Sequence, residues 1–434
     1  MAYEATPART RAIAAARDSE ALRAALRVAV STRAAVLLVA IFAALSFGPA
    51  NGGLARENAA KFDDPALTHS LAEPLLAPLA RWDSVWYLRI ADSGYGGTAS
   101  LRPGQSPRLA PSSAPRAAFF PLYPLLVRAV ATPFGASRGA LLVAAYAVSL
   151  AAFLGALVLL YRLTELELGR RLARPTLLLL AVFPAAVYFG APYSESLFLL
   201  LAVGAFYAAR SGSWAWAGAC AGLASATRSA GLLLLIPLAM LWWSSRERRP
   251  RDAAWLLLAP LGIAAYAAWL GLVEGDALRF LDVQEAWSRE LKVPLTGAWD
   301  GLVAAVDGVR QLASGSRTPV YFEVAAGDPF RIAAINVMLF ATLIFAVVAC
   351  VGVWRRLPRA YGAWVGASLL LPLTFPVTPQ PLMSLPRFVA ILFPLFMWLA
   401  IVCDERRNTD LVAAGFAVGL GLFTAQYASW HWIS

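Results

Sequence analysis

Residues 139–161 read GALLVAAYAVSLAAFLGALVLLY, and residues 332–354 read IAAINVMLFATLIFAVVACVGVW. Neither stretch contains a charged side chain, and each is long enough to cross the roughly 30 Å hydrocarbon core of a bilayer as one α-helix. The chain of 434 residues is 59% hydrophobic and 15% charged, whereas about a quarter of the residues of a soluble domain are charged. Because a soluble chain of this composition could not cover its surface with polar groups, the sequence predicts an integral membrane protein.

Similar apolar runs recur along the chain and predict an all-α, polytopic fold with about eleven transmembrane helices. The runs lie near residues 30–49, 139–161, 174–190, 195–209, 213–227, 231–244, 253–272, 332–354, 360–376, 387–403 and 410–430. Several contain a proline, which removes a backbone hydrogen bond from a helix. Since neighbouring membrane helices can satisfy the freed groups, we expect some broken helices in the bundle.

Arginine is concentrated in the short segments between these runs. The segments cover residues 162–174, 245–252, 355–359 and 404–408. Because positively charged connections stay on the cytoplasmic side, we expect them and the arginine-rich residues 1–27 to be cytoplasmic. Residues 50–138 and 273–330 then form two long extracytoplasmic loops. All of these segments belong to one predicted transmembrane domain, residues 1–434, in the cell membrane.

Both long loops are predicted to contain helices at the membrane surface. In the first loop, residues 81–91 (RWDSVWYLRIA) form an expected interfacial helix that ends near Gly94. In the second loop, amphipathic segments cover residues 277–291 and 299–312.

The formal net charge of +11 raises the question of a nucleic-acid partner. The arginines are distributed between apolar segments and do not form one basic face, so we expect membrane lipids as partners and no nucleic acid. The three cysteines lie within apolar runs without disulfide or metal-ligand spacing, and the chain has two histidines. We therefore predict no cysteine or histidine metal site, and a divalent metal bound by carboxylates is left as an alternative.

Asp83 is the first candidate for chemistry, because it stands where the predicted interfacial helix begins. A carboxylate there can simply stabilise the helix dipole, or it can act on a lipid-borne substrate at the bilayer surface. Trp82 beside it is an interfacial aromatic residue and a candidate for substrate contact. Asp92 lies nine positions further on, about half a turn out of phase. It is therefore a weaker candidate, which can join Asp83 only if the helix ends before it.

Four further polar residues interrupt apolar sequence on the predicted outer side. Tyr193 and Glu195 belong to 191–196 (APYSES), where Glu195 either favours the start of the next helix or contacts substrate. The positive-inside rule explains arginines on the cytoplasmic side and so does not account for Arg228 and Arg387 on the outer side. Their guanidinium groups either snorkel to the interface or bind a phosphate through a bidentate fork.

Read together, several segments resemble the PIG-V family, the second mannosyltransferase of GPI synthesis. The ordered motifs are 81–84 (RWDS), 87–91 (YLRIA) with 94–95 (GY), 118–125 (AFFPLYPL), 191–198 (APYSESLF), 226–229 (ATRS) and 384–388 (SLPRF) with 393–394 (FP). The resemblance covers roughly residues 81–395. One departure is Ala230, where the family usually has Asn.

The resemblance implies a GT-C type glycosyltransferase, which transfers mannose from a polyprenyl-phosphate carrier outside the cytoplasm with inversion at the anomeric carbon. In the family the acidic residue of the Trp-Asp pair is the presumed catalytic residue, which is Asp83 here. The partners would be the polyprenyl-phosphate-sugar donor and a lipid or glycan acceptor, and the composition of the chain argues against a GPI precursor. The alternatives are transfer of another sugar from the same carrier, or a non-catalytic lipid-carrier transporter or flippase.

Overall fold

The structure is a computed structural model that describes residues 7–47, 75, 77–95, 115–321, 328–377 and 380–431. Within these ranges the chain is helical and contains no β-strand, and Arg289 and Val377 form an isolated antiparallel bridge. The α-helices that reach from the N-terminus to the second long loop are α1 (Pro7–Phe47), α4 (Ser84–Ser93), α5 (Leu122–Ala131), α6 (Arg138–Leu168), α7 (Arg170–Ala181), α8 (Glu195–Arg210), α9 (Trp214–Thr227), α10 (Leu235–Ser244), α11 (Pro250–Ala254) and α12 (Leu261–Val273). The later ones are α13 (Arg279–Asp282), α14 (Thr296–Ser314), α15 (Pro329–Arg356), α16 (Arg359–Thr374), α17 (Leu385–Ala390), α18 (Phe393–Glu405) and α19 (Thr409–Ala428).

Short 3₁₀-helices join or extend many of these elements. They are η1 (Ala77–Leu79), η3 (Pro115–Ala118), η4 (Thr132–Phe134), η5 (Pro184–Phe189), η6 (Ser229–Leu234), η7 (Trp255–Leu258) and η8 (Val283–Trp287). The prediction of broken helices is confirmed, because η5 begins at Pro184 shortly after α7 ends, and Pro394 lies at the start of α18. Pro372 lies inside α16, close to its end.

Five helical stretches in the described residues are long and apolar enough to cross a membrane. They are Asp18–Phe47, Arg138–Leu168, Pro250–Val273, Pro329–Arg356 and Thr409–Ala428. The other predicted runs coincide with shorter or interrupted helices, such as α8 and the α17–α18 pair. The helical membrane fold agrees with the sequence, while the expected number of about eleven spans stays a prediction.

One end of the bundle is closed by ion pairs between helix termini. Arg171 pairs with Asp404 at 2.8 Å, and Arg356 pairs with Glu405 at 3.0 Å. Glu167 at the end of α6 accepts hydrogen bonds from Arg210 and from the Tyr361 hydroxyl. These contacts bring together three of the four arginine-rich connections that the sequence analysis assigned to the cytoplasm, namely residues 162–174, 355–359 and 404–408.

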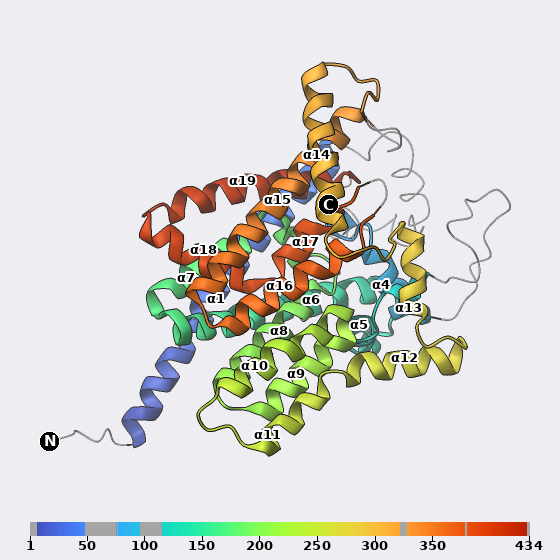
Figure 1. The fold of residues 1–434 in the computed structure, drawn as a ribbon. Helices are drawn as coiled ribbons and strands as arrows, with labels where there is room; N and C mark the ends of the chain where they lie inside the picture. Colours follow the sequence, from blue (N-terminus) through green and yellow to red (C-terminus); the bar gives the residue numbers. More distant parts are fainter. Residues whose placement is uncertain are drawn as a thin grey trace.

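The first and second long loops meet at a different end of the bundle, around α4, α5 and α13 (Figure 1). The Tyr266 hydroxyl donates a 2.9 Å hydrogen bond to the carbonyl oxygen of Ala117, and the rings of Phe120 and Phe280 lie 5.5 Å apart. Helix α6 starts beside this end and finishes at the ion pairs, and its length separates the two by on the order of 45 Å. The described parts of both long loops therefore lie on the same side of the molecule.

We expect this shared side to face away from the cytoplasm, because the opposite end carries the arginine-rich connections. In a cysteine-free variant, a single cysteine at Ser93 on α4 should react with an impermeant maleimide added to intact cells. A cysteine at Arg248 should react only after the membrane is opened. Both side chains are exposed. Labelling of position 93 solely from the cytoplasmic side would reverse the predicted orientation.

Candidate active site

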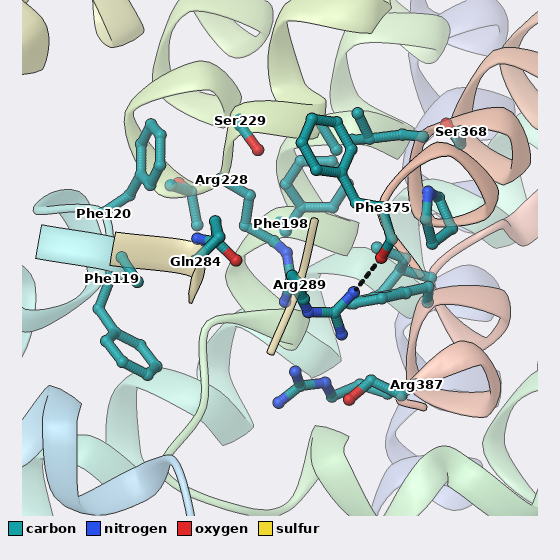
Figure 2. A pocket seen from close by; sticks show the side chains of 18 of the residues that line it. Phe119, Phe120, Phe198, Arg228, Ser229, Gln284, Arg289, Ser368, Phe375 and Arg387 are labelled. Atoms are coloured by element: carbon teal, nitrogen blue, oxygen red, sulfur yellow. Dashed lines mark hydrogen bonds between the residues drawn. The ribbon is translucent and has the colours of Figure 1, made fainter. Parts of the chain in front are cut away.

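A cavity of about 230 Å³ lies where the two long loops meet α16 and α17. Its charged lining residues are Asp83, Arg228, Arg289 and Arg387. The rest of the wall is largely apolar and partly aromatic, with side chains contributed by Phe119, Phe120, Phe198, Phe280, Phe375 and Phe388. Figure 2 shows the three arginines close together in the middle of the cavity, with Phe119 and Phe120 to one side. The cavity thus combines a cationic centre with an apolar wall.

Asp83 is held in the cavity by a strained turn that precedes α4. Trp82 adopts a left-handed backbone with φ of 55°, which is uncommon for a residue other than glycine. The backbone N–H of Asp83 donates to the Tyr193 hydroxyl at 3.0 Å, and this hydroxyl donates to the carbonyl of Arg81 at 3.1 Å. Tyr427 also donates to the carbonyl of Arg81, at 2.9 Å. Two buried tyrosines therefore set the position of the Asp83 backbone.

The carboxylate of Asp83 does not cap α4, although the residue stands at the N-cap position. Instead, Arg387 Nη1 lies 2.5 Å from Asp83 Oδ2, and Arg387 Nε lies 3.5 Å from Glu195 Oε1. Glu195 also pairs with Arg228, whose Nη1 lies 2.5 Å from the same oxygen. The exposed fraction of the Glu195 side chain is 1%. A carboxylate so deeply buried requires charged partners, and here it holds two arginines in place.

Arg289 enters the cavity from the second long loop. Its Nη1 donates to the carbonyl of Phe375 at 3.2 Å, and its Nη2 donates to the carbonyl of Met383 at 3.3 Å. Burial, assisted by the positive charges of Arg387 and Arg228 against the opposing charge of Asp83, lowers the pKa of the Arg289 guanidinium to about 10. Arg289 therefore stays protonated at neutral pH, in surroundings with an excess of positive charge.

The predicted site residues fall into three groups in the structure. Asp83, Arg228 and Arg387 line the cavity. Tyr193 and Glu195 lie behind them and hold them through the contacts described above.

Trp82 and Asp92 do not line the cavity in the described part of the chain. The Trp82 ring packs edge-on against Trp430, with 5.7 Å between the ring centroids. Helix α4 continues through Asp92 to Ser93, and the Asp92 side chain is exposed. The helix end that would have brought Asp92 to Asp83 is therefore absent.

Arg289 and Tyr427 were missed by the sequence analysis. Arg289 lies in a long loop, where the positive-inside rule says little about single charges. Tyr427 lies in the last apolar run. A tyrosine in such a run does not by itself indicate a hydrogen bond to the site.

No group of three or more His, Cys, Asp or Glu side chains that could hold a metal ion occurs among the described residues. The two carboxylates of the cluster, Asp83 and Glu195, are both paired with arginine.

The role of Tyr193 can be tested separately from the chemistry. Tyr193→Phe removes the hydroxyl that accepts from the Asp83 N–H and donates to the Arg81 carbonyl. The Arg81 carbonyl still accepts from Tyr427, but the N–H of Asp83 loses its partner. We therefore expect a loss of about 1–3 kcal/mol in stability and roughly tenfold slower turnover from a displaced carboxylate. Tyr321→Phe, an exposed tyrosine of the second loop, should change neither the melting temperature nor the turnover. Wild-type values for Tyr193→Phe would show that the turn does not need this hydroxyl.

The fold and the site define a helical membrane protein with an aspartate–arginine–glutamate cluster set in a partly aromatic cavity. Residues 22–241, just over half of the chain, match the family described as mannosyltransferase (PIG-V), and the chain belongs to this family. The matched region contains Asp83, Glu195 and Arg228, whereas Arg289 and Arg387 lie beyond it. GPI mannosyltransferase 2 of Yarrowia lipolytica is 38% identical over 102 residues, which are 23% of this chain and 29% of the yeast protein. This match thus spans less than a third of the curated relative.

Two solved membrane enzymes are similar to the chain at low identity. The oligosaccharyltransferase of Archaeoglobus fulgidus, in its apo form, is 14% identical with a TM-score of 0.46, over 94% of this chain and 56% of that protein. ArnT of Cupriavidus metallidurans, bound to undecaprenyl phosphate, is 16% identical with a TM-score of 0.38, over 82% of this chain and 74% of that protein. The function proposed below rests on the family match and on the site itself.

Proposed function

We propose that this protein is a glycosyltransferase that moves mannose from a polyprenyl-phosphate carrier to a lipid- or glycan-linked acceptor on the extracytoplasmic face of the membrane. The observation that carries the proposal is Asp83, a carboxylate held inside a cavity that also contains three arginines and an aromatic wall. Family membership supports the same chemistry. The arginines suit a phosphate, and the aromatic wall suits an apolar chain that enters from the bilayer.

The proposed reaction is a single displacement. The acceptor hydroxyl attacks the anomeric carbon of the sugar, and its proton passes to Asp83. The bond between the anomeric carbon and the phosphate oxygen breaks, and its electron pair leaves with the phosphate. The configuration at the anomeric carbon is inverted, and the carrier leaves as a phosphate monoester with one more negative charge.

The ion pair with Arg387 orients Asp83 for this step. Only Oδ2 is engaged with Arg387, and no hydrogen bond to Oδ1 occurs among the described residues. Oδ1 is therefore free to accept the proton of an acceptor hydroxyl. A positioned general base of this kind contributes roughly 10²–10⁴-fold in rate.

Transfer itself is the direct test. The purified protein in lipid nanodiscs should transfer labelled mannose from polyprenyl-phosphate-mannose to an acceptor present in a membrane lipid extract. Polyprenyl-phosphate-glucose tests the alternative of another sugar on the same carrier. A chelator added to the reaction tests whether the carboxylates act through a divalent metal. Failure of transfer with every sugar donor, by protein that still binds the carrier, would argue for a lipid-carrier transporter and against the proposal.

A further inference from the structure

Arg289 differs from the other two arginines of the cavity in the partners it has. Arg228 and Arg387 are each paired with a carboxylate, whereas Arg289 donates to two neutral backbone carbonyls. Within the described residues, no carboxylate oxygen lies within ion-pair distance of Arg289. A guanidinium group has five N–H donors, so three of those of Arg289 are left for a ligand.

The charges of the cluster do not cancel. Arg228, Arg289 and Arg387 contribute three positive charges, and Asp83 and Glu195 contribute two negative charges. One positive charge is left over inside a cavity with a largely apolar wall, where the interaction of charges is stronger than in water. An anion with a single negative charge would neutralise the cluster.

The three guanidinium groups surround one aromatic ring, so this excess charge is local. The central carbons of Arg228, Arg289 and Arg387 lie 5.5, 5.7 and 5.5 Å from the centroid of Phe388. Arg289 is further fixed by the bridge between its own backbone and that of Val377. Figure 2 shows its side chain reaching across the cavity toward Phe375, between Arg228 and Arg387.

The wall of the cavity indicates what kind of anion fits. Phenylalanines from the first loop, from α8 and from the second loop lie beside the arginines, and they offer no hydrogen bonds to a hydrated ion. A phosphodiester that carries an apolar chain fits both parts of the cavity, because its phosphate can bind the arginines and its chain can pack against the apolar wall. It has one negative charge, and its oxygens suit the fork of a guanidinium group.

We propose that Arg289 is the residue that binds the phosphate of the carrier lipid, while Arg228 and Arg387 chiefly position the two carboxylates. This inference rests on the function proposed above. During transfer the phosphodiester becomes a monoester, and negative charge grows on the oxygen that leaves the anomeric carbon. The free N–H donors of Arg289 stabilise this charge through hydrogen bonds. Arg289 therefore favours both the binding of the carrier and the departure of the phosphate.

Binding of decaprenyl phosphate, which carries no sugar and is the phosphate monoester that the proposed reaction releases, separates this role from catalysis. Arg289→Gln keeps an amide donor for the carbonyls but loses the charge, and we expect it to weaken binding by about 10–100-fold, as for a lost charge-assisted hydrogen bond. Arg289→Lys keeps the charge but loses the fork, so its binding should fall between the two. Arg310→Gln is the matched control, because Arg310 is an exposed arginine of the same loop outside the cavity. It should bind as the wild type does.

The possible results lead to different conclusions. Wild-type affinity in a folded Arg289→Gln variant would overturn the role of Arg289 and leave the proposed function intact. If that variant does not fold, wild-type affinity in Arg289→Lys would overturn it instead. Failure of the wild-type protein to bind decaprenyl phosphate would count against the proposed function itself. Inorganic phosphate should not displace the lipid at similar concentrations. Displacement would overturn the assignment of the site to a carrier lipid, because the site would then bind free phosphate.

Discussion

Asp83→Asn is expected to reduce mannosyl transfer by at least about 10²-fold, as for the loss of a positioned general base. The amide keeps the size of the side chain, and its oxygen can still accept from Arg387, so the turn before α4 should be preserved. The protein should fold, and it should bind decaprenyl phosphate at least as tightly as the wild type. The substitution removes a negative charge from the cluster that receives the phosphate. Repulsion of the phosphate therefore falls, and binding should not weaken.

The matched control is Asp92→Asn, which makes the same chemical change near the other end of α4 and outside the cavity. It should keep wild-type turnover. If Asp83 only stabilised the helix dipole, Asp83→Asn would cost about 0.3–1 kcal/mol in stability and leave turnover nearly intact. A folded Asn variant with turnover equal to that of Asp92→Asn would remove Asp83 from the mechanism. Such a result would also favour the alternative that the protein is a lipid-carrier transporter, which needs no general base.

The architecture could be predicted because it depends on hydrophobicity averaged over stretches of about twenty residues. Charge-free runs such as 139–161 specify helices whatever their neighbours are, and the end of the interfacial helix at Gly94 follows from one glycine with positive φ. The interrupted helices were expected from their prolines. Which of the short helices cross the membrane depends on packing between them, and hydropathy alone does not decide this.

The composition of the site was partly predictable, but its pairing was not. Asp83, Glu195, Arg228 and Arg387 stood out because polar residues are costly in apolar surroundings. That Arg387 pairs with Asp83, 304 residues away in the chain, depends on the tertiary fold. Trp82 was expected to contact substrate. Its backbone has a positive φ, and in the structure its ring packs against Trp430. Arg289 gave no signal, because a single arginine in a long polar loop is ordinary.

Glu195→Ala is expected to destabilise the protein more than any other single change in the site, by about 3–5 kcal/mol, as for breaking a buried ion pair. The side chain is almost wholly buried and pairs with both Arg228 and Arg387, so its removal leaves two guanidinium groups without this partner. Arg387 keeps Asp83, whereas no other carboxylate pairs with Arg228 among the described residues. Thermal unfolding in detergent, with an intrinsic-fluorescence readout, measures the effect.

A double-mutant cycle shows whether the uncompensated charge is the cause. Glu195→Ala combined with Arg228→Ala should be more stable than Glu195→Ala alone, because the second substitution removes the charge that lost its partner. Glu290→Ala, at an exposed carboxylate of the second loop, is the control and should melt as the wild type does. If Glu195→Ala also melted at the wild-type temperature, the cluster would not depend on this carboxylate. In that case the arginines would be held by Asp83 and by the ring of Phe388, and Glu195 would return to the candidates for direct substrate contact.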